Sequence, residues 1–366
     1  MADETGGQPT SVPVRRPRKR LIAAAAAAIV AVLTVVTTTA SASAVRAASA
    51  AAATTTTTTK PSCSRQCMTG IVDEILKSMV KHDPYKLPLA SMYEATENMH
   101  PAALGMMDAW RTVTAAGKPS PLAIDTVNET AYFALDVTEG SSKEQSILWG
   151  WIKTVNSKIT ELCLFINRSR GDHGFSFSAA ELPGNYKSWM SPPANRTRAS
   201  RATLLELGAA QWNTNVDFTP TVASDCKFSE MGWSVVDPGD SGTGSTKPLR
   251  CVWPSSRPTD AKSEVVVADP VLGIVVSEGT VAGKVFPYPY YGHMISAFIP
   301  DQMTAAQTAQ YAWMKSYEAT KGAQPLLEPM EATGMTLRVD QYYNGALQGD
   351  QIDVNLGGPD ESSLWE

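Results

Sequence analysis

The feature that most limits the folds open to this chain is a weak internal repeat. Three short segments of one copy recur in the same order in the other. The first copy holds segments 96–98, 123–132 and 155–161, and the second holds 229–232, 267–275 and 343–348. A repeat of this length is a folded domain, not a solenoid unit. The sequence therefore predicts two tandem α+β domains that form a pseudo-dimer within one chain.

The N-terminal 60 residues carry an address signal. A basic cluster at 15–20 precedes an apolar run at 21–36, and small residues follow at 40–44. This pattern predicts a secretory signal within residues 1–46. A cleaved signal peptide and a retained type II anchor both fit, although the strictly apolar stretch is shorter than the roughly 20 residues of a typical span. Residues 47–60 are rich in Ala and Thr and predict a disordered stalk.

Cysteines and glycosylation sequons fit passage through the secretory pathway. Because an oxidising compartment favours pairing, we expect two disulfides among the five cysteines. Cys226 and Cys251 enclose a Gly-rich excursion, so a bridge there gains about 3 kcal/mol from loop closure. Cys63 pairs with Cys67 at the start of the first helix, and Cys163 is left as a buried thiol on its strand. The sequons predict glycans at Asn128, Asn167 and Asn195.

Composition excludes several function classes. The formal net charge of −5 does not suit a nucleic-acid surface. The spacing of His and Cys matches no metal motif, and no Gly-x-Ser-x-Gly step of a serine hydrolase is present. We therefore expect neither a metal nor an organic cofactor.

Periodicity places the folded part in two domains separated by a linker. Apolar residues between 71 and 80 recur at steps of three and four, which predicts an amphipathic helix that ends at His82-Asp83-Pro84. Strand patterns follow, and Asn344-Gly345 is a strong hairpin signal. The predicted boundaries are 61–167 for the first domain, 168–198 for the linker and 199–366 for the second domain.

Several short motifs resemble a fungal secreted family defined by a domain of unknown function, number 8021. They lie at residues 63–67, 82–90, 96–98, 110–111, 225–226, 230, 251, 269–275 and 357–365. The resemblance covers roughly residues 61 to 366. Its domains look like the cone of nuclear transport factor 2 and SnoaL-like proteins, in which a helix and a bent sheet enclose a pocket. Relatives with that cone include isomerases, dehydratases, cyclases and non-enzymatic binders, so the fold does not decide the activity.

The resemblance makes Glu97 the leading catalytic candidate. Ketosteroid-isomerase-like cones place a carboxylate base at the end of this strand, where an apolar pocket raises its pKa. Asn98 follows as a hydrogen-bond donor to a substrate oxygen. The structural alternative is that Glu97 caps a turn.

Other polar and aromatic residues complete the predicted site. His82 and Asp83 are candidates for a proton-shuttling pair, although a helix-stop turn explains them better, because Asp83-Pro84 ends the helix. Tyr93, Trp110 and Arg111 are candidate substrate contacts, with ordinary core packing as the alternative for the aromatic residues. Glu230 occupies the position of Glu97 in the second copy.

Two functions remain open on the sequence. The first is a cofactor-independent lyase, isomerase or cyclase that acts on a small organic molecule. The second is a secreted or membrane-anchored small-molecule binder without catalysis. What separates them is whether Glu97 or Glu230 points into a closed apolar pocket. In either case we expect a monomer with an internal pseudo-dimer.

Overall fold

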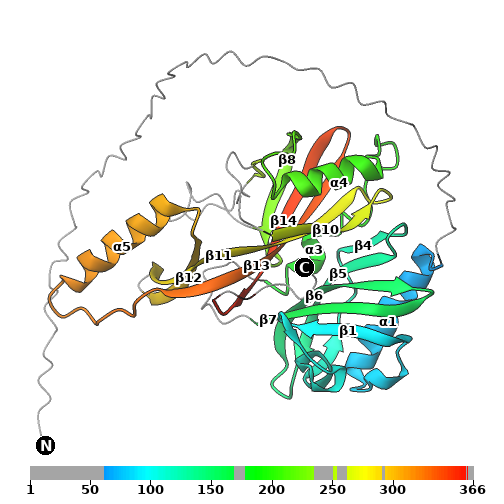
Figure 1. The fold of residues 1–366 in the computed structure, drawn as a ribbon, viewed down its shortest axis with the longest axis horizontal. Coiled ribbons are helices and arrows are strands. Elements are labelled where there is room, and N and C mark those ends of the chain that lie inside the picture. The colour runs from blue at the N-terminus through cyan, green and yellow to red at the C-terminus, as the bar shows by residue number, and fades with distance from the viewer. Residues whose placement is uncertain are drawn as a thin grey trace, which may run out of the picture. The chain divides into compact units, whose positions relative to one another are not determined.

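The computed structural model describes residues 62–168, 178–234, 250–253, 262–290, 293–359 and 361. Two seven-stranded sheets dominate this part of the chain, with a few helices beside them (Figure 1). The predicted α+β class is therefore confirmed. The address segment and the Thr-rich stalk lie outside the described residues, and no described helix has the length and apolar content to span a bilayer. We call residues 62–168 the first lobe and the described residues from 199 onward the second lobe.

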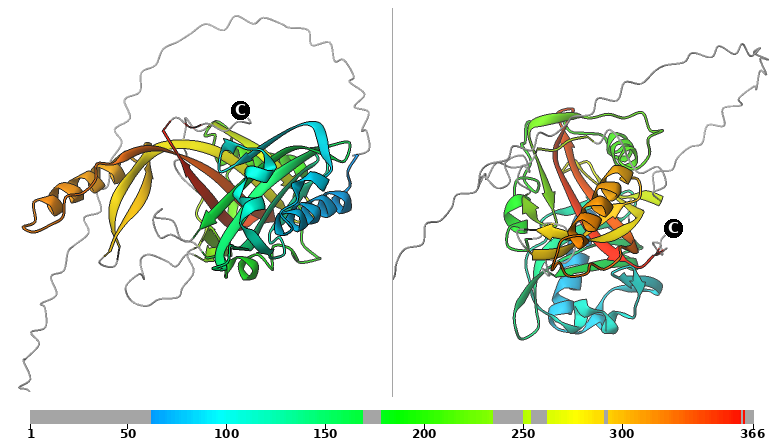
Figure 2. Two further views of the ribbon diagram at one scale, coloured as in Figure 1. Left: turned by 90° about the horizontal axis from the view of Figure 1, so that it is seen from below. Right: turned by 90° about the vertical axis from the view of Figure 1, so that its left-hand side faces the viewer.

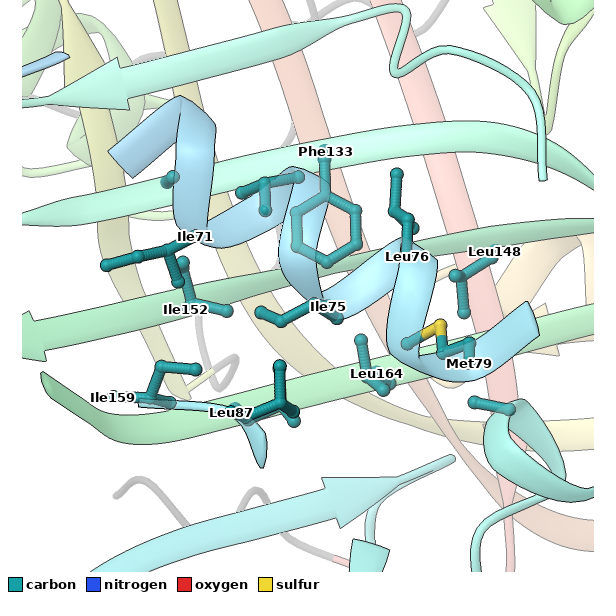
Figure 3. Packing of buried hydrophobic residues seen from close by; sticks show 14 of the residues in the cluster. Ile71, Ile75, Leu76, Met79, Leu87, Phe133, Leu148, Ile152, Ile159 and Leu164 are labelled. Atoms are coloured by element: carbon teal, nitrogen blue, oxygen red, sulfur yellow. The ribbon is translucent and has the colours of Figure 1, made fainter. Parts of the chain in front are cut away.

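The first lobe begins with the predicted amphipathic helix. Ser64 caps it by accepting a hydrogen bond from the Cys67 N–H, and the chain leaves helical geometry at His82, whose φ is 54°. Its apolar face packs on one face of the first sheet (Figure 3). The helices are α1 (Arg65–Val80), η1 (Pro84–Lys86), η2 (Leu104–Met106) and α2 (Asp108–Arg111).

The first sheet has the order β2-β1-β7-β6-β5-β3, and β4 also pairs with β5. Only the contact between β1 and β7 is parallel among its pairings. The strands are β1 (Leu89–Glu97), β2 (His100–Pro101), β3 (Val113–Ala116), β4 (Leu122–Asp125), β5 (Thr130–Glu139), β6 (Glu144–Val155) and β7 (Lys158–Arg168).

The second sheet repeats this order. It runs β10-β11-β13-β14-β8-β9, with β12 also on β11, and its one parallel contact joins β8 to β14. Helix α4 (Arg201–Ala210) precedes it, as α1 precedes the first sheet. The strands are β8 (Thr221–Glu230), β9 (Trp233–Ser234), β10 (Lys262–Asp269), β11 (Ile274–Tyr290), β12 (His293–Pro300), β13 (Met330–Tyr343) and β14 (Ala346–Gly357).

The second lobe carries an extension that the first lobe lacks. β11 has 17 residues against 10 in β5, and its C-terminal half pairs with β12. Helix α5 (Thr304–Glu318) follows β12 and contacts both strands, as Figures 1 and 2 show. In the first lobe the corresponding half of β5 pairs instead with β3, a strand that comes earlier in the chain.

The two sheets share an apolar core. One buried cluster draws Trp149 and Phe165 from the first sheet and Val276 and Leu337 from the second. Tyr132 also donates a hydrogen bond to Asp353 across this core, at 2.7 Å. Residues Thr58–Glu366 form one compact unit, and burial of this shared core stabilises it.

Part of the predicted linker belongs to the same core. Leu182, in the short helix α3 (Leu182–Asn185), is fully buried, and so are Tyr186 and Trp189. Residues 169–177 of that linker lie outside the described ranges. The segment 178–198 therefore fills space between the sheets instead of only joining two domains.

Two ion pairs connect the lobes reciprocally. Arg201, the first residue of α4, pairs with Asp125 at the end of β4, at 2.7 Å. Arg65, the first residue of α1, pairs with Asp269 at the end of β10. Both aspartates are buried, and each also accepts backbone N–H groups of the turn that follows it.

Both predicted disulfides are present. Cys63 pairs with Cys67, and Cys226 pairs with Cys251 across a sequence separation of 25. Cys163 is buried and takes part in neither bridge, as predicted. The disulfides indicate an oxidising, secretory or extracellular environment.

Candidate functional site

Glu97 acts as a helix cap. Its carboxylate accepts hydrogen bonds from the N–H groups of Asp108 and Ala109, at 2.6 and 2.8 Å, where α2 begins. Burial raises the pKa of Glu97, and these two N–H groups oppose the rise. Glu97 lines neither of two cavities that the described residues form, one beside residues 184–189 and one on β1. This geometry matches the turn-cap alternative, and a catalytic role for Glu97 stays a prediction.

Asn98 is hydrogen-bonded to strand β7, directly after the end of β1. It has a positive φ of 51°, and its Oδ1 accepts a hydrogen bond from Ile166 N at 3.0 Å. Asn98 lines neither of the two cavities described for this part of the chain, and its use as a donor to a substrate oxygen stays a prediction.

His82 and Asp83 form the helix stop and do not contact each other through their side chains in the described hydrogen bonds. The Nδ1 atom of His82 lies 2.7 Å from the carbonyl oxygen of Trp110. Asp83 caps η1 and pairs with Lys86 at 3.1 Å, and this hydrogen bond is the main cause that lowers the pKa of Asp83. The contacts support the helix-stop interpretation.

The remaining predicted contacts are scattered. Trp110 is buried in the first-lobe core, where its indole N–H donates to Ser78 Oγ at 2.9 Å. Tyr93 lines an open depression on β1, and Arg111 is exposed at the end of α2. Glu230 lies on the second sheet. The structure therefore does not gather the predicted residues around one site.

The sequons differ in accessibility. Asn128 and Asn195 are exposed. Asn167 is half-buried: its Nδ2 donates to the carbonyl oxygen of Val354 at 3.2 Å, and its Oδ1 accepts from the Trp149 indole. Because a glycan attaches at Nδ2, the fold disfavours the predicted glycan on Asn167 and accommodates the other two.

A polar cluster that the sequence did not predict lies inside the second lobe. β13 and β14 place Asp340 opposite Asp350 on the face that α4 covers. Gln211, at the C-terminal end of α4, donates a hydrogen bond from Nε2 to Asp340 Oδ2 at 2.5 Å. Arg338 pairs with Asp350, and the charge of Asp350 acts on Asp340 across the strand pair. We call these four residues the polar chain.

Burial sets the charge of the polar chain. It raises the pKa of Asp340 to about 8, and the negative charge of Asp350 raises it further in the same direction. Burial also raises the pKa of Asp350, and the positive charge of the Arg338 guanidinium opposes that rise. At neutral pH Asp340 therefore keeps its proton, and Asp350 is the aspartate paired with Arg338.

Four buried atoms of the polar chain lack a hydrogen-bond partner among the described residues. They are Gln211 Oε1, Arg338 Nε, Asp340 Oδ1 and Asp350 Oδ1. An unsatisfied buried polar atom costs about 1–3 kcal/mol, so such atoms mark positions for water or for a polar group of a bound molecule.

One side of the polar chain is less enclosed than the side under α4. Arg338, Ile352 and Glu230 lie in one row across β13, β14 and β8, and all three are only half-buried. Glu230 is thus the only predicted site residue that the described strands place in the same row as the polar chain.

The sequence contains a weak signal for this cluster. Arg338 and Asp340 alternate with the apolar residues Leu337 and Val339, which predicts a strand with a solvent-facing polar side. Since α4 covers that side, Asp340 is buried and Arg338 is half-buried instead.

No group of three or more His, Cys, Asp or Glu side chains in the described ranges is arranged to hold a metal ion. No protein-family model matches the chain, and no curated protein matches it. Among solved structures, a de novo designed protein with a curved β-sheet matches at 13% identity and a TM-score of 0.23, covering 28% of this chain and 88% of its own. A putative isomerase from Bacillus subtilis matches at 10% identity and a TM-score of 0.23. The match covers 28% of this chain and 87% of the isomerase.

Proposed function

We propose that this protein is a cofactor-independent isomerase, lyase or cyclase of a small organic molecule, with its reactive centre in the polar interior of the second lobe. The observation that carries the proposal is the buried pair of Asp340 and Asp350 beside Arg338. Two carboxyl groups that hold one proton between them supply an acid and a base at neutral pH.

The roles follow from the charges. Asp340 donates its proton toward a carbonyl oxygen of the substrate, and the Asp350 carboxylate accepts a proton from the adjacent carbon. Arg338 stabilises the negative charge that develops on the oxygen. Gln211 is a positioning residue, because its amide fixes the carboxyl group of Asp340.

We further propose that the two lobes are copies of one ancestral domain and form an internal pseudo-dimer. The matching strand orders support this. The reciprocal ion pairs support it more specifically, because each lobe supplies the arginine for the other's aspartate at corresponding positions. An isologous interface between identical copies shows this kind of exchange.

The disulfides and the N-terminal sequence support a secreted protein or one anchored at its N-terminus outside the cytoplasm. Non-catalytic binding of a small molecule is the second candidate function. It is favoured by one observation: among the described residues, the linings of the two cavities include neither Glu97 nor Glu230 nor any residue of the polar chain.

Proton exchange tests the catalytic proposal. The full chain, secreted from a eukaryotic host, is incubated in D2O with a panel of enolisable ketones and β-hydroxy ketones, and loss of the α-proton signal is followed by NMR. We expect exchange with at least one class of compound, and Asp340→Asn should slow it by about 100-fold or more.

Asp353→Asn is the matched control. Asp353 is also buried on β14 but faces the shared core between the sheets. It should keep the exchange rate even if it lowers the melting temperature. Equal slowing by both variants, or no exchange with any compound, would overturn catalysis by the polar chain; the second outcome would favour the binding function.

A further inference from the structure

A second site lies on the opposite face of the second sheet. Side chains alternate along a strand, so Gln341 and Gly349 face away from Asp340 and Asp350. There they line a cavity of about 300 Å³ that is closed on one side by residues 184–189. We call this cavity the amide pocket. It does not include any residue of the polar chain.

The wall of the amide pocket is fixed in place. Trp189 packs edge-on against Tyr186, with ring centroids 4.9 Å apart, and Gln341 Nε2 donates to the Trp189 carbonyl oxygen at 3.0 Å. Gly349 is required beneath the indole, since a Cβ there would lie 2.3 Å from Trp189 Cζ2. The hydroxyl groups of Tyr186 and Ser229 are hydrogen-bonded at 2.7 Å. These contacts hold the pocket open without a ligand.

The pocket wall contains hydrogen-bond donors and hydrogen-bond acceptors that bond to no other described residue. The unused donors are Trp189 Nε1–H and the Ser188 hydroxyl. The unused acceptors are Gln341 Oε1 and Gln348 Oε1, whose amide nitrogens already bond to backbone carbonyls. A hydroxyl group donates and accepts at once, so a ligand rich in hydroxyls satisfies both sets.

The charges at the rim of the amide pocket and its volume further restrict which ligands fit. Asp225 and Lys227 stand on β8 at the exposed rim, one of each sign, so the pocket has no net preference for an anion or a cation. A volume of about 300 Å³ lies at the lower end of small-molecule sites, which span roughly 300–1,000 Å³. Trp189 and Tyr343 add aromatic surface for the apolar face of a ring.

We propose that the amide pocket binds a neutral polyhydroxylated molecule of one or two rings, a monosaccharide or disaccharide. This inference does not rest on the proposed catalysis, since the two sites lie on opposite faces of the sheet. Either can fail without the other.

Calorimetric titration of the full chain with a panel of neutral hexoses and disaccharides tests the proposal. We expect saturable binding of at least one sugar. Ser188→Ala removes a hydroxyl, and Asp225→Asn replaces a carboxylate acceptor by an amide donor; neither opens the core, and each should weaken binding by roughly tenfold. Gly349→Ala displaces Trp189 and should abolish binding, with the fold checked by circular dichroism.

Asp217→Asn is the control, because Asp217 is exposed, lies near β8 in sequence and is outside the pocket. It should leave sugar affinity unchanged. The proposal is overturned if no neutral sugar binds, or if Ser188→Ala and Asp225→Asn bind like the control. It is also overturned if gluconate or glucosamine binds more tightly than every neutral sugar.

Discussion

The interiors of the two lobes differ at corresponding positions. Counting from the helix caps Ser64 and Ser200 and from the hairpin residues Asn156 and Asn344, each residue of the polar chain has a first-lobe counterpart. The pairs are Gln211 and Ile75, Arg338 and Gly150, Asp340 and Ile152, and Asp350 and Leu162. Figure 3 shows Ile75 and Ile152 together in the first-lobe core.

The same arrangement of helix and sheet therefore encloses an apolar core in the first lobe and a charged network in the second lobe. The apolar version gains from burial and needs no hydrogen-bond partners. The polar version loses that gain and leaves four buried atoms without a hydrogen-bond partner among the described residues. Because packing alone would favour the first-lobe solution, the polar residues of the second lobe indicate function more strongly than any residue of the first lobe.

The largest expected effect comes from placing a carboxyl group in the apolar interior. Ile152→Asp introduces a group without partners beside Ile75, so the free energy of unfolding should fall by about 3–5 kcal/mol or more. Urea denaturation measures it. Ile152→Val, the control, should cost only about 0.5–1.5 kcal/mol. If Ile152→Asp costs no more stability than Ile152→Val, the first lobe tolerates a polar interior. The difference between the two lobe interiors would then have no energetic basis.

Converting the polar chain into its apolar counterpart gives a smaller effect of opposite sign. The variant Gln211→Ile, Arg338→Met, Asp340→Ile and Asp350→Leu keeps similar volume and removes all four polar groups together. Stability should be unchanged or rise by about 1–4 kcal/mol, while proton exchange is lost. Marked destabilisation would show that the polar chain is a structural network.

The smallest effect is a pH dependence confined to the second lobe. Asp340 titrates near pH 8 in the fold and near 3.8 when unfolded. Between these values only the folded chain holds the proton, so stability falls as pH rises, by about 1.4 kcal/mol per pH unit.

The window from pH 6.5 to 7.5 lies below the pKa of Asp340 and above that of Asp353, which burial raises only to about 6. In that window the wild-type unfolding free energy should fall with pH, and Asp340→Asn should remove most of the fall. Parallel pH curves for both proteins would contradict a protonated Asp340.

Local signals in the sequence predicted the frame of the molecule. The α1 helix, its stop at His82, the Asn344-Gly345 hairpin and both disulfides depend on neighbouring residues or on a single loop. The order of the repeat also predicted two similar sheets. The sequence left a catalytic role and a cap role open for Glu97. It could not identify the capped N–H groups, because these belong to α2, eleven and twelve residues later, after an irregular segment.

The sequence by itself determined where helices start, where strands turn and which cysteines pair, because these depend on backbone preferences and short-range closure. Only the tertiary structure decided which polar residues are buried. Asp340 and Arg338 occupy a polar face of β13 that looks solvent-exposed in the sequence, and packing of α4 on that face takes them out of water. Their charges and their proposed chemistry follow from that burial, which no local pattern encodes.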